Sequence, residues 1–297
     1  MTTAAVFQSF CSREKRLPGH GFVTVAPTSP ATGIELMRLA NFRTHALANM
    51  MDVEAILCEI YTARVAGLSD FAMFDGGAHR AYHTLRMLAL PGCGRVHAVE
   101  ADPFMAQTFR DIIGRQEPEA AKRVVLHQAA LQDDPQRHSI PWKSSPSHVG
   151  RSSIVSTNPE RNTIWGDNPD MVYRDEMSVP STTIDGILDT ETLPLPFLKS
   201  DLEGADLIAL KGAETTLKNK RPVIAFENSV HAPKVHGFTI VDMVAYFGRL
   251  GYVPMNFAGE RMSEQNWFGF FEAWLVPIEL QDWLAKQLDA ALSQRDL

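Results

Sequence analysis

The stretch FAMFDGGAHRAYHTLRMLALPGCGRVHAVEADP, residues 71–103, decides the fold. It contains a short apolar run, a glycine turn, a segment with helical spacing, and a second apolar run that ends in acids. This is the pattern of a strand–helix–strand unit. The same alternation continues along the chain, and it predicts an α/β protein with a doubly wound, Rossmann-like parallel sheet.

Seven strands are expected in this sheet. The first two lie in the opening stretch, and the others are RVVLHQAAL (123–131), PFLKSD (196–201), RPVIAFEN (221–228), YVPMNF (252–257) and EAWLVP (272–277). Only loop separates the last two strands, so we expect the seventh to run antiparallel to the rest. Helical spacing predicts helices over 81–90, 103–115, 204–219, 238–251 and 280–292.

Two regions lie outside this alternation. Residues 30–68 have apolar positions at helical spacing, which predicts an N-terminal helical extension over 1–68 and a Rossmann-like domain over 69–297. Residues 133–180 are polar and rich in turn formers, so we expect a long loop that ends in an extended run. A loop of that length in a compact domain is usually functional or mobile.

Composition limits the class of protein. The 297 residues are 45% hydrophobic and carry a formal net charge of −7, which is unlike the basic footprint of a nucleic-acid-binding protein. No signal-peptide pattern or membrane-length apolar run is evident, and the three cysteines match no metal spacing. We therefore expect a cytoplasmic protein that acts on a small molecule, without nucleic acid or membrane as a partner. A homodimer is left open.

The glycine turn after the first strand predicts a nucleotide-type ligand. Such a turn can bring bare backbone N–H groups close to a ligand, and Glu100 ends the next strand, 25 residues after Asp75, where an acid can bind ribose hydroxyls. The G-x-G-x-x-G pattern is absent, and an Asp at the turn suits an ammonium group better than a pyrophosphate. This favours S-adenosylmethionine (SAM) over NAD. The structural alternative is that Gly76 and Gly77 only form a tight turn and Glu100 caps the next helix.

Several motifs together resemble a known family. They are FDGGAHRAYHTL, GRVHAVEADP, VVLHQAAL, TTIDGIL, LKSDLEGADLIALKGAE and RPVIAFEN, spread over about residues 70–275. This set resembles the FkbM family of SAM-dependent methyltransferases. The most specific part is LKSDLEGAD, which is similar to the family pattern Lys-x-Asp-x-Glu-Gly-x-Glu, with Asp206 in place of the second Glu.

The resemblance implies which residues bind the cofactor. Asp75, Gly76, Gly77 and Ala78 match the loop for the methionine half of SAM. Glu100, followed by Ala101, matches the acid on the ribose hydroxyls. Gln128 and Ala129 match the region beside the adenine.

Ionisable side chains gather where the fourth and fifth strands end. Asp201 and Glu203 follow the fourth strand, Glu227 ends the fifth, and His231 follows closely. Because parallel strands present their carboxyl ends at one edge, we expect these groups to converge beside the SAM methyl group. We expect His231 to be the base that takes the acceptor proton, with Asp201 as second candidate. Lys199 is expected to pair with Glu203 or Glu227.

Two other interpretations of this cluster stay open. Asp201, Glu227 and Asn228 offer oxygen ligands of the kind that a hard divalent cation uses, but no ligand spacing within one segment requires a metal, so none is expected. Asp201 and Glu203 could instead favour the positive end of the following helix, with Lys199 as neutralising partner. His79, His83 and His97 are expected on helix or strand surfaces, without a role.

The sequence thus predicts a SAM-dependent methyltransferase that methylates a hydroxyl of a sugar or secondary metabolite. One alternative is an NAD(P)-dependent oxidoreductase, which the missing third glycine and Asp75 oppose. The other is a non-catalytic binding protein with a Rossmann fold, which the intact acids Asp201, Glu203 and Glu227 oppose.

Overall fold

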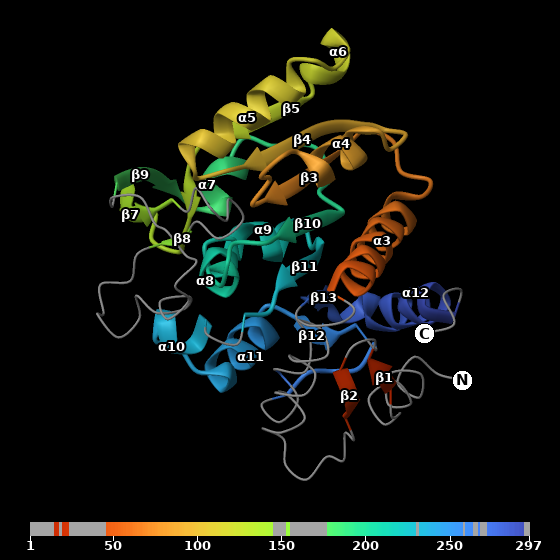
Figure 1. The fold of residues 1–297 in the computed structure, drawn as a ribbon. Helices are drawn as coiled ribbons and strands as arrows, with labels where there is room; N and C mark the ends of the chain where they lie inside the picture. The colour runs from red at the N-terminus through yellow and green to blue at the C-terminus, as the bar shows by residue number, and fades with distance from the viewer. Residues whose placement is uncertain are drawn as a thin grey trace.

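The fold was examined in a computed structural model of the chain (Figure 1). The structure describes residues 15–17, 20–23, 46–144, 153–154, 177–229, 232–257, 259–263, 267 and 272–293. Short elements outside the main layers are β1 (Lys15–Leu17), β2 (His20–Val23), α6 (Pro118–Ala121), α10 (Ala232–His236) and the 3-10 helix η3 (Ile278–Leu280). None of the described helices combines the length and apolar character that a membrane crossing needs.

A seven-stranded sheet forms the centre of the molecule, as predicted. Its strands are β3 (Phe71–Gly76), β4 (Cys93–Val99), β5 (Val124–His127), β10 (Phe197–Ser200), β11 (Val223–Glu227), β12 (Tyr252–Asn256) and β13 (Glu272–Pro277). Their order is β12-β13-β11-β10-β3-β4-β5. The last strand, β13, pairs antiparallel with both β11 and β12, which confirms the expected reversal.

Side chains of the central strands alternate between two apolar layers. Phe71, Met73 and Phe197 share a core with helices on one face, and Phe74 and Leu198 share a core with helices on the other. Figure 1 shows the two helical layers on either side of the sheet. The first layer has α3 (Ala46–Val65), α4 (Tyr82–Leu88) and α12 (Gln281–Ser293), and the second has α7 (Ile184–Leu188), α8 (Asp206–Lys211), α9 (Glu214–Asn219) and α11 (Ile240–Arg249).

Helix α3 belongs to the first of these layers. Ile56, Ile60 and Tyr61 are almost completely buried in the core that β3, β10 and α12 also form. Helix α5 (Pro103–Ile113) begins with Pro103 and is capped by the Asp102 carboxylate. It packs on Ala98 of β4 through Phe109. The domain boundary between residues 68 and 69 stays a prediction.

The loop expected over residues 133–180 is partly a second sheet. Strands β6 (Ala130–Leu131), β7 (Ser139–Lys143), β8 (Ser153–Ile154) and β9 (Met177–Thr182) form it, in the order β6-β9-β7-β8. The expectation of loop was therefore wrong for β7 and β8, while the extended run at its end is strand β9. Strand β7 alternates exposed and buried side chains, which is a strand signal that the surrounding turn formers obscured.

The single helix expected over 204–219 is two helices, α8 and α9. They are separated at Gly212, where a side chain would overlap the carbonyl oxygen of Gln132. The chain breaks the helix at a residue that can approach the neighbouring backbone closely.

Candidate active site

A cavity of about 210 Å³ lies at the carboxyl ends of the central strands. It is at the point where the strand order reverses, since β3 is followed outward by β4 on one side and is paired with β10 on the other. Six of the residues predicted from the sequence line it, and they come from four separate segments. They are Gly77, Glu100, Ala101, Ala129, Asp201 and Glu203.

The glycine turn after β3 fits closely against the end of β10. Gly77 has a φ of 73°, a conformation that glycine adopts most easily, and a Cβ there would overlap the carbonyl oxygen of Asp201. The N–H groups of Gly77 and Ala78 both donate to the Val99 carbonyl, at 3.0 and 2.9 Å. The expectation that this turn offers bare N–H groups to a ligand is therefore wrong for these two amides, which are already hydrogen-bonded within the protein.

Glu100 is held at the cavity wall by backbone groups. Its Oε2 accepts the His79 N–H at 2.9 Å, and its Oε1 accepts the Asp102 N–H at 2.8 Å. Burial raises the pKa of Glu100 to about 7, although these two hydrogen bonds act in the opposite direction. The position and the fixed orientation of this carboxylate suit an acceptor for two neighbouring hydroxyls.

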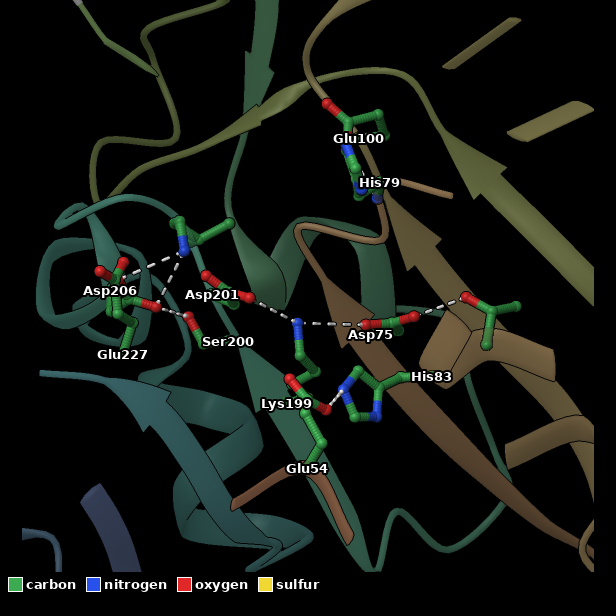
Figure 2. A network of polar contacts seen from close by, with 12 residues as sticks. Glu54, Asp75, His79, His83, Glu100, Lys199, Ser200, Asp201, Asp206 and Glu227 are labelled. Atoms are coloured by element: carbon green, nitrogen blue, oxygen red, sulfur yellow. Dashed lines mark hydrogen bonds and ion pairs between the residues drawn. The ribbon is translucent and has the colours of Figure 1, made fainter. Parts of the chain in front are cut away.

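Lys199 lies between two carboxylates beside the cavity (Figure 2). Its ammonium group is 3.2 Å from Asp201 Oδ2 and 3.8 Å from Asp75 Oδ1, and Thr84 donates to the other Asp75 oxygen at 2.6 Å. Burial would lower the pKa of Lys199, but Asp201 and Asp75 raise it above its usual value. The expected pairing of Lys199 with Glu203 or Glu227 is replaced by these two ion pairs, because the strand register sets Lys199 directly opposite Asp75.

Further acids lie behind the cavity wall. Glu227 is opposite Glu272 in the register of β11 and β13, and burial and then neighbouring carboxylates raise the pKa of both. Burial raises the pKa of Asp206 to about 7, although its hydrogen bond from Ser200 opposes this shift. Asp206 also accepts the Leu202 N–H, and Glu227 accepts the Gly204 N–H at 3.2 Å. Asp206 and Glu227 therefore hold the backbone amides of Leu202 and Gly204 beside the cavity.

Two histidines expected on the surface are buried. His83 forms an ion pair with Glu54 of α3 at 2.6 Å, and His97 contacts Glu191 at 2.8 Å and His127 at 3.1 Å. Burial opposes the charge on His83, but contacts with Cys58 and Glu54 raise its pKa to about 9. The prediction failed because helical and strand spacing did not reveal which face these histidines occupy.

The remaining predicted site residues lie outside the cavity lining. Asp75 is fully buried below the turn and Gln128 accepts a hydrogen bond from Arg110. Glu227 lies behind Gly204, and the Asn228 amide donates to the Trp267 carbonyl. The described residues that line the cavity do not include Asp75, Gly76, Ala78, Gln128 or Glu227.

His231 lies outside the described residues, so its expected role as a base stays a prediction. Within the part of the chain that the structure describes, no group of three or more His, Cys, Asp and Glu side chains is placed to hold a metal ion.

Sequence reasoning missed several lining residues, and two of them, His79 and Trp142, carry rings. His79 lines the cavity and has a φ of 45°, which puts it in the turn rather than on a helix. Trp142 of β7 also lines it, and it comes from the second sheet. The alternation of β7 was the signal that could have identified Trp142.

The strand order, the reversed last strand and a cavity at the switch point define the Rossmann-like fold of class I methyltransferases. A family model described as the Methyltransferase FkbM domain matches residues 75–254, more than half of the chain. The chain therefore belongs to the FkbM methyltransferase family, as the sequence motifs indicated.

Solved structures with a similar arrangement were also found. The methyltransferase FkbM from Methylobacillus flagellatus KT is 16% identical with a TM-score of 0.44, and the match covers 92% of this chain but only 58% of that one. An O-methyltransferase from Bacillus cereus in complex with SAH is 12% identical with a TM-score of 0.38, covering 86% of this chain and 93% of that one. A comparison with curated proteins gave no match.

The close fit of the glycine turn predicts the effect of Gly77→Ala. The variant should lose about 1–3 kcal/mol of unfolding free energy, because alanine is strained at this φ and its methyl group displaces the Asp201 carbonyl. Chemical denaturation measures the change. The control is Gly248→Ala in α11, where nothing lies within 4 Å of the added methyl group and stability should rise by about 0.5–1 kcal/mol. A Gly77→Ala protein as stable as the wild type would contradict the described turn.

Proposed function

We propose that this protein is a SAM-dependent methyltransferase that transfers the methyl group to a hydroxyl of a small molecule, such as a sugar or a secondary metabolite. The observation that carries the proposal is the single cavity wall that brings Glu100, Asp201 and Glu203 together from the ends of β4 and β10. Family membership supports the reaction, and the site chemistry supports the cofactor.

The charges around the cavity suit a cationic donor. SAM carries a sulfonium cation and an ammonium group, and the carboxylates of Asp201 and Glu203 lie where these charges would be stabilised. Glu100 would accept hydrogen bonds from the ribose hydroxyls in its ionised form, and its two backbone hydrogen bonds hold it in place for that role.

The same features disfavour the oxidoreductase alternative. A dinucleotide needs free backbone N–H groups at the turn to bind its diphosphate. Here the N–H groups of Gly77, Ala78 and His79 donate to Val99 and Glu100 instead. A diphosphate would also lie beside acids rather than beside basic side chains.

Methyl transfer needs an acceptor oxygen in line with the methyl group and the sulfur, and it needs a group that takes the hydroxyl proton. Asp201 and Glu203 line the cavity and can orient the hydroxyl, while Lys199 fixes the Asp201 carboxylate. His231 and Asp201 are the proposed bases. Glu227 contacts the Gly204 N–H, which favours a positioning role for it in place of the catalytic one first expected.

Ligand titration separates the two enzyme hypotheses. SAM and its demethylated product, S-adenosylhomocysteine (SAH), should raise the thermal unfolding temperature, since a ligand that binds only the folded state stabilises it, by about 2.7 kcal/mol at a concentration of 100 Kd. NAD should leave the unfolding temperature unchanged. Stabilisation by NAD and not by SAM or SAH would contradict the proposal.

Turnover separates an enzyme from a binding protein. Asp201→Asn should lower kcat by about 10²–10⁴-fold at saturating SAM, because the amide retains the shape of the side chain but cannot act as a base. The assay follows SAH release with a panel of hydroxylated acceptors, and His231→Ala is measured in parallel.

The matched control is Asp189→Asn, at an exposed position after α7, which should keep full activity. Full turnover in both Asp201→Asn and His231→Ala would show that the proposed bases are wrong. Binding of SAH by a wild-type protein that turns over no hydroxylated acceptor would favour the non-catalytic alternative.

A further inference from the structure

Trp142 connects the second sheet to the cavity. Along β7, Ser139 and Pro141 are exposed, while Ile140 and Trp142 are buried. The buried side of β7 packs into a small apolar cluster in which Trp142 and Ile140 join Ala101, Ala130 and Val179. The second sheet therefore contacts the segments that follow β4 and β5, at the edge where the cavity opens.

The cavity has an acidic part and an apolar part. Asp201 and Glu203, after β10, provide two acids, whereas Ala101, Ala129 and Trp142 provide apolar surface beyond β4 and β5, where Glu100 is the acid of the lining. Ala101 and Ala129 are small, and Val99 and Leu131 extend the apolar lining. A pocket of this kind suits a planar, weakly polar group better than a charged one.

We infer that the indole of Trp142 forms one wall of the adenine-binding part of the site and stacks against the adenine of SAM. This inference rests on the proposed function. Glu100 would bind the ribose, and Ala101, the residue after it, lies in the apolar cluster with Trp142. The base attached to that ribose is therefore placed beside Trp142, while the sulfonium end is placed beside Asp201.

The contact with adenine is made by the aromatic ring of Trp142. The Trp142 Nε1 atom is buried and has no hydrogen-bond partner among the described residues. It is also shielded from solvent, so stacking by the ring, rather than hydrogen bonding by the N–H group, is the contact expected with the base. Phenylalanine should therefore replace tryptophan here with little loss, whereas an aliphatic residue should not.

The test compares Trp142→Leu with Trp142→Phe. Calorimetric titration with SAH should show binding about 5–150-fold weaker for Trp142→Leu, the range that loss of one base–aromatic stack produces, and within a few-fold of wild type for Trp142→Phe. Adenosine lacks the amino-acid half of SAH. Its binding affinity should fall by a similar factor in Trp142→Leu. Thermal unfolding of the free variants checks that each one is folded.

Fluorescence provides a second measurement that does not depend on the Leu variant. SAH should change the tryptophan emission of the wild type, and most of that change should disappear in Trp142→Phe. The control is Trp283→Phe, whose tryptophan packs against the core of α3, α12 and the sheet, and which should keep the full response.

The outcomes distinguish this inference from the proposed function. A wild-type protein that fails to bind SAH would overturn both. A wild type that binds SAH, with unchanged affinity in Trp142→Leu or an unchanged fluorescence response in Trp142→Phe, would overturn only the role of Trp142. A change confined to the acceptor KM would also overturn it, because the indole would then contact the acceptor.

Discussion

The buried ammonium group of Lys199, held between Asp75 and Asp201, joins the two halves of the site. Strands β3 and β10 meet where the sheet changes direction, and their register sets Lys199 opposite Asp75. The side chain of Ser200 contacts Asp206 of α8, whereas Asp201 pairs with Lys199 and lines the cavity. Lys199 is buried, and a buried cation is costly unless acids lie close to it. This explains why Asp75 and Asp201 lie beside it at the strand ends.

This ion-pair arrangement lies beside the cavity and reaches it through Asp201. Asp75 lies 3.8 Å from Lys199 and accepts a hydrogen bond from Thr84, while the glycine turn that follows it packs against the end of β10 and directs its amides to Val99. The cavity lining has the acids Asp201 and Glu203 in one part and the small apolar side chains of Ala101 and Ala129 in another. A ligand with a cationic centre and a flat base matches that division, and this match links the fold to the proposed methyl transfer.

The sequence predicted the sheet well because long apolar runs and loop lengths determine strand number and direction. It also placed Gly77, Glu100, Asp201 and Glu203 correctly at the strand ends. It did not give Asp75 as a partner of Lys199, since that pairing depends on the register between β3 and β10, which are far apart in the sequence. Trp142 was missed because β7 is a short strand within a polar segment, and its neighbours are distant in sequence.

The most direct test of the central interaction is the unfolding free energy of Lys199→Met at neutral pH. The account predicts a loss of about 3–5 kcal/mol, because the methionine fills the space but leaves the buried Asp75 carboxylate without its cation. Lys286→Met, at an exposed position of α12, should change stability by less than about 0.5 kcal/mol. A Lys199→Met protein as stable as this control would contradict the account.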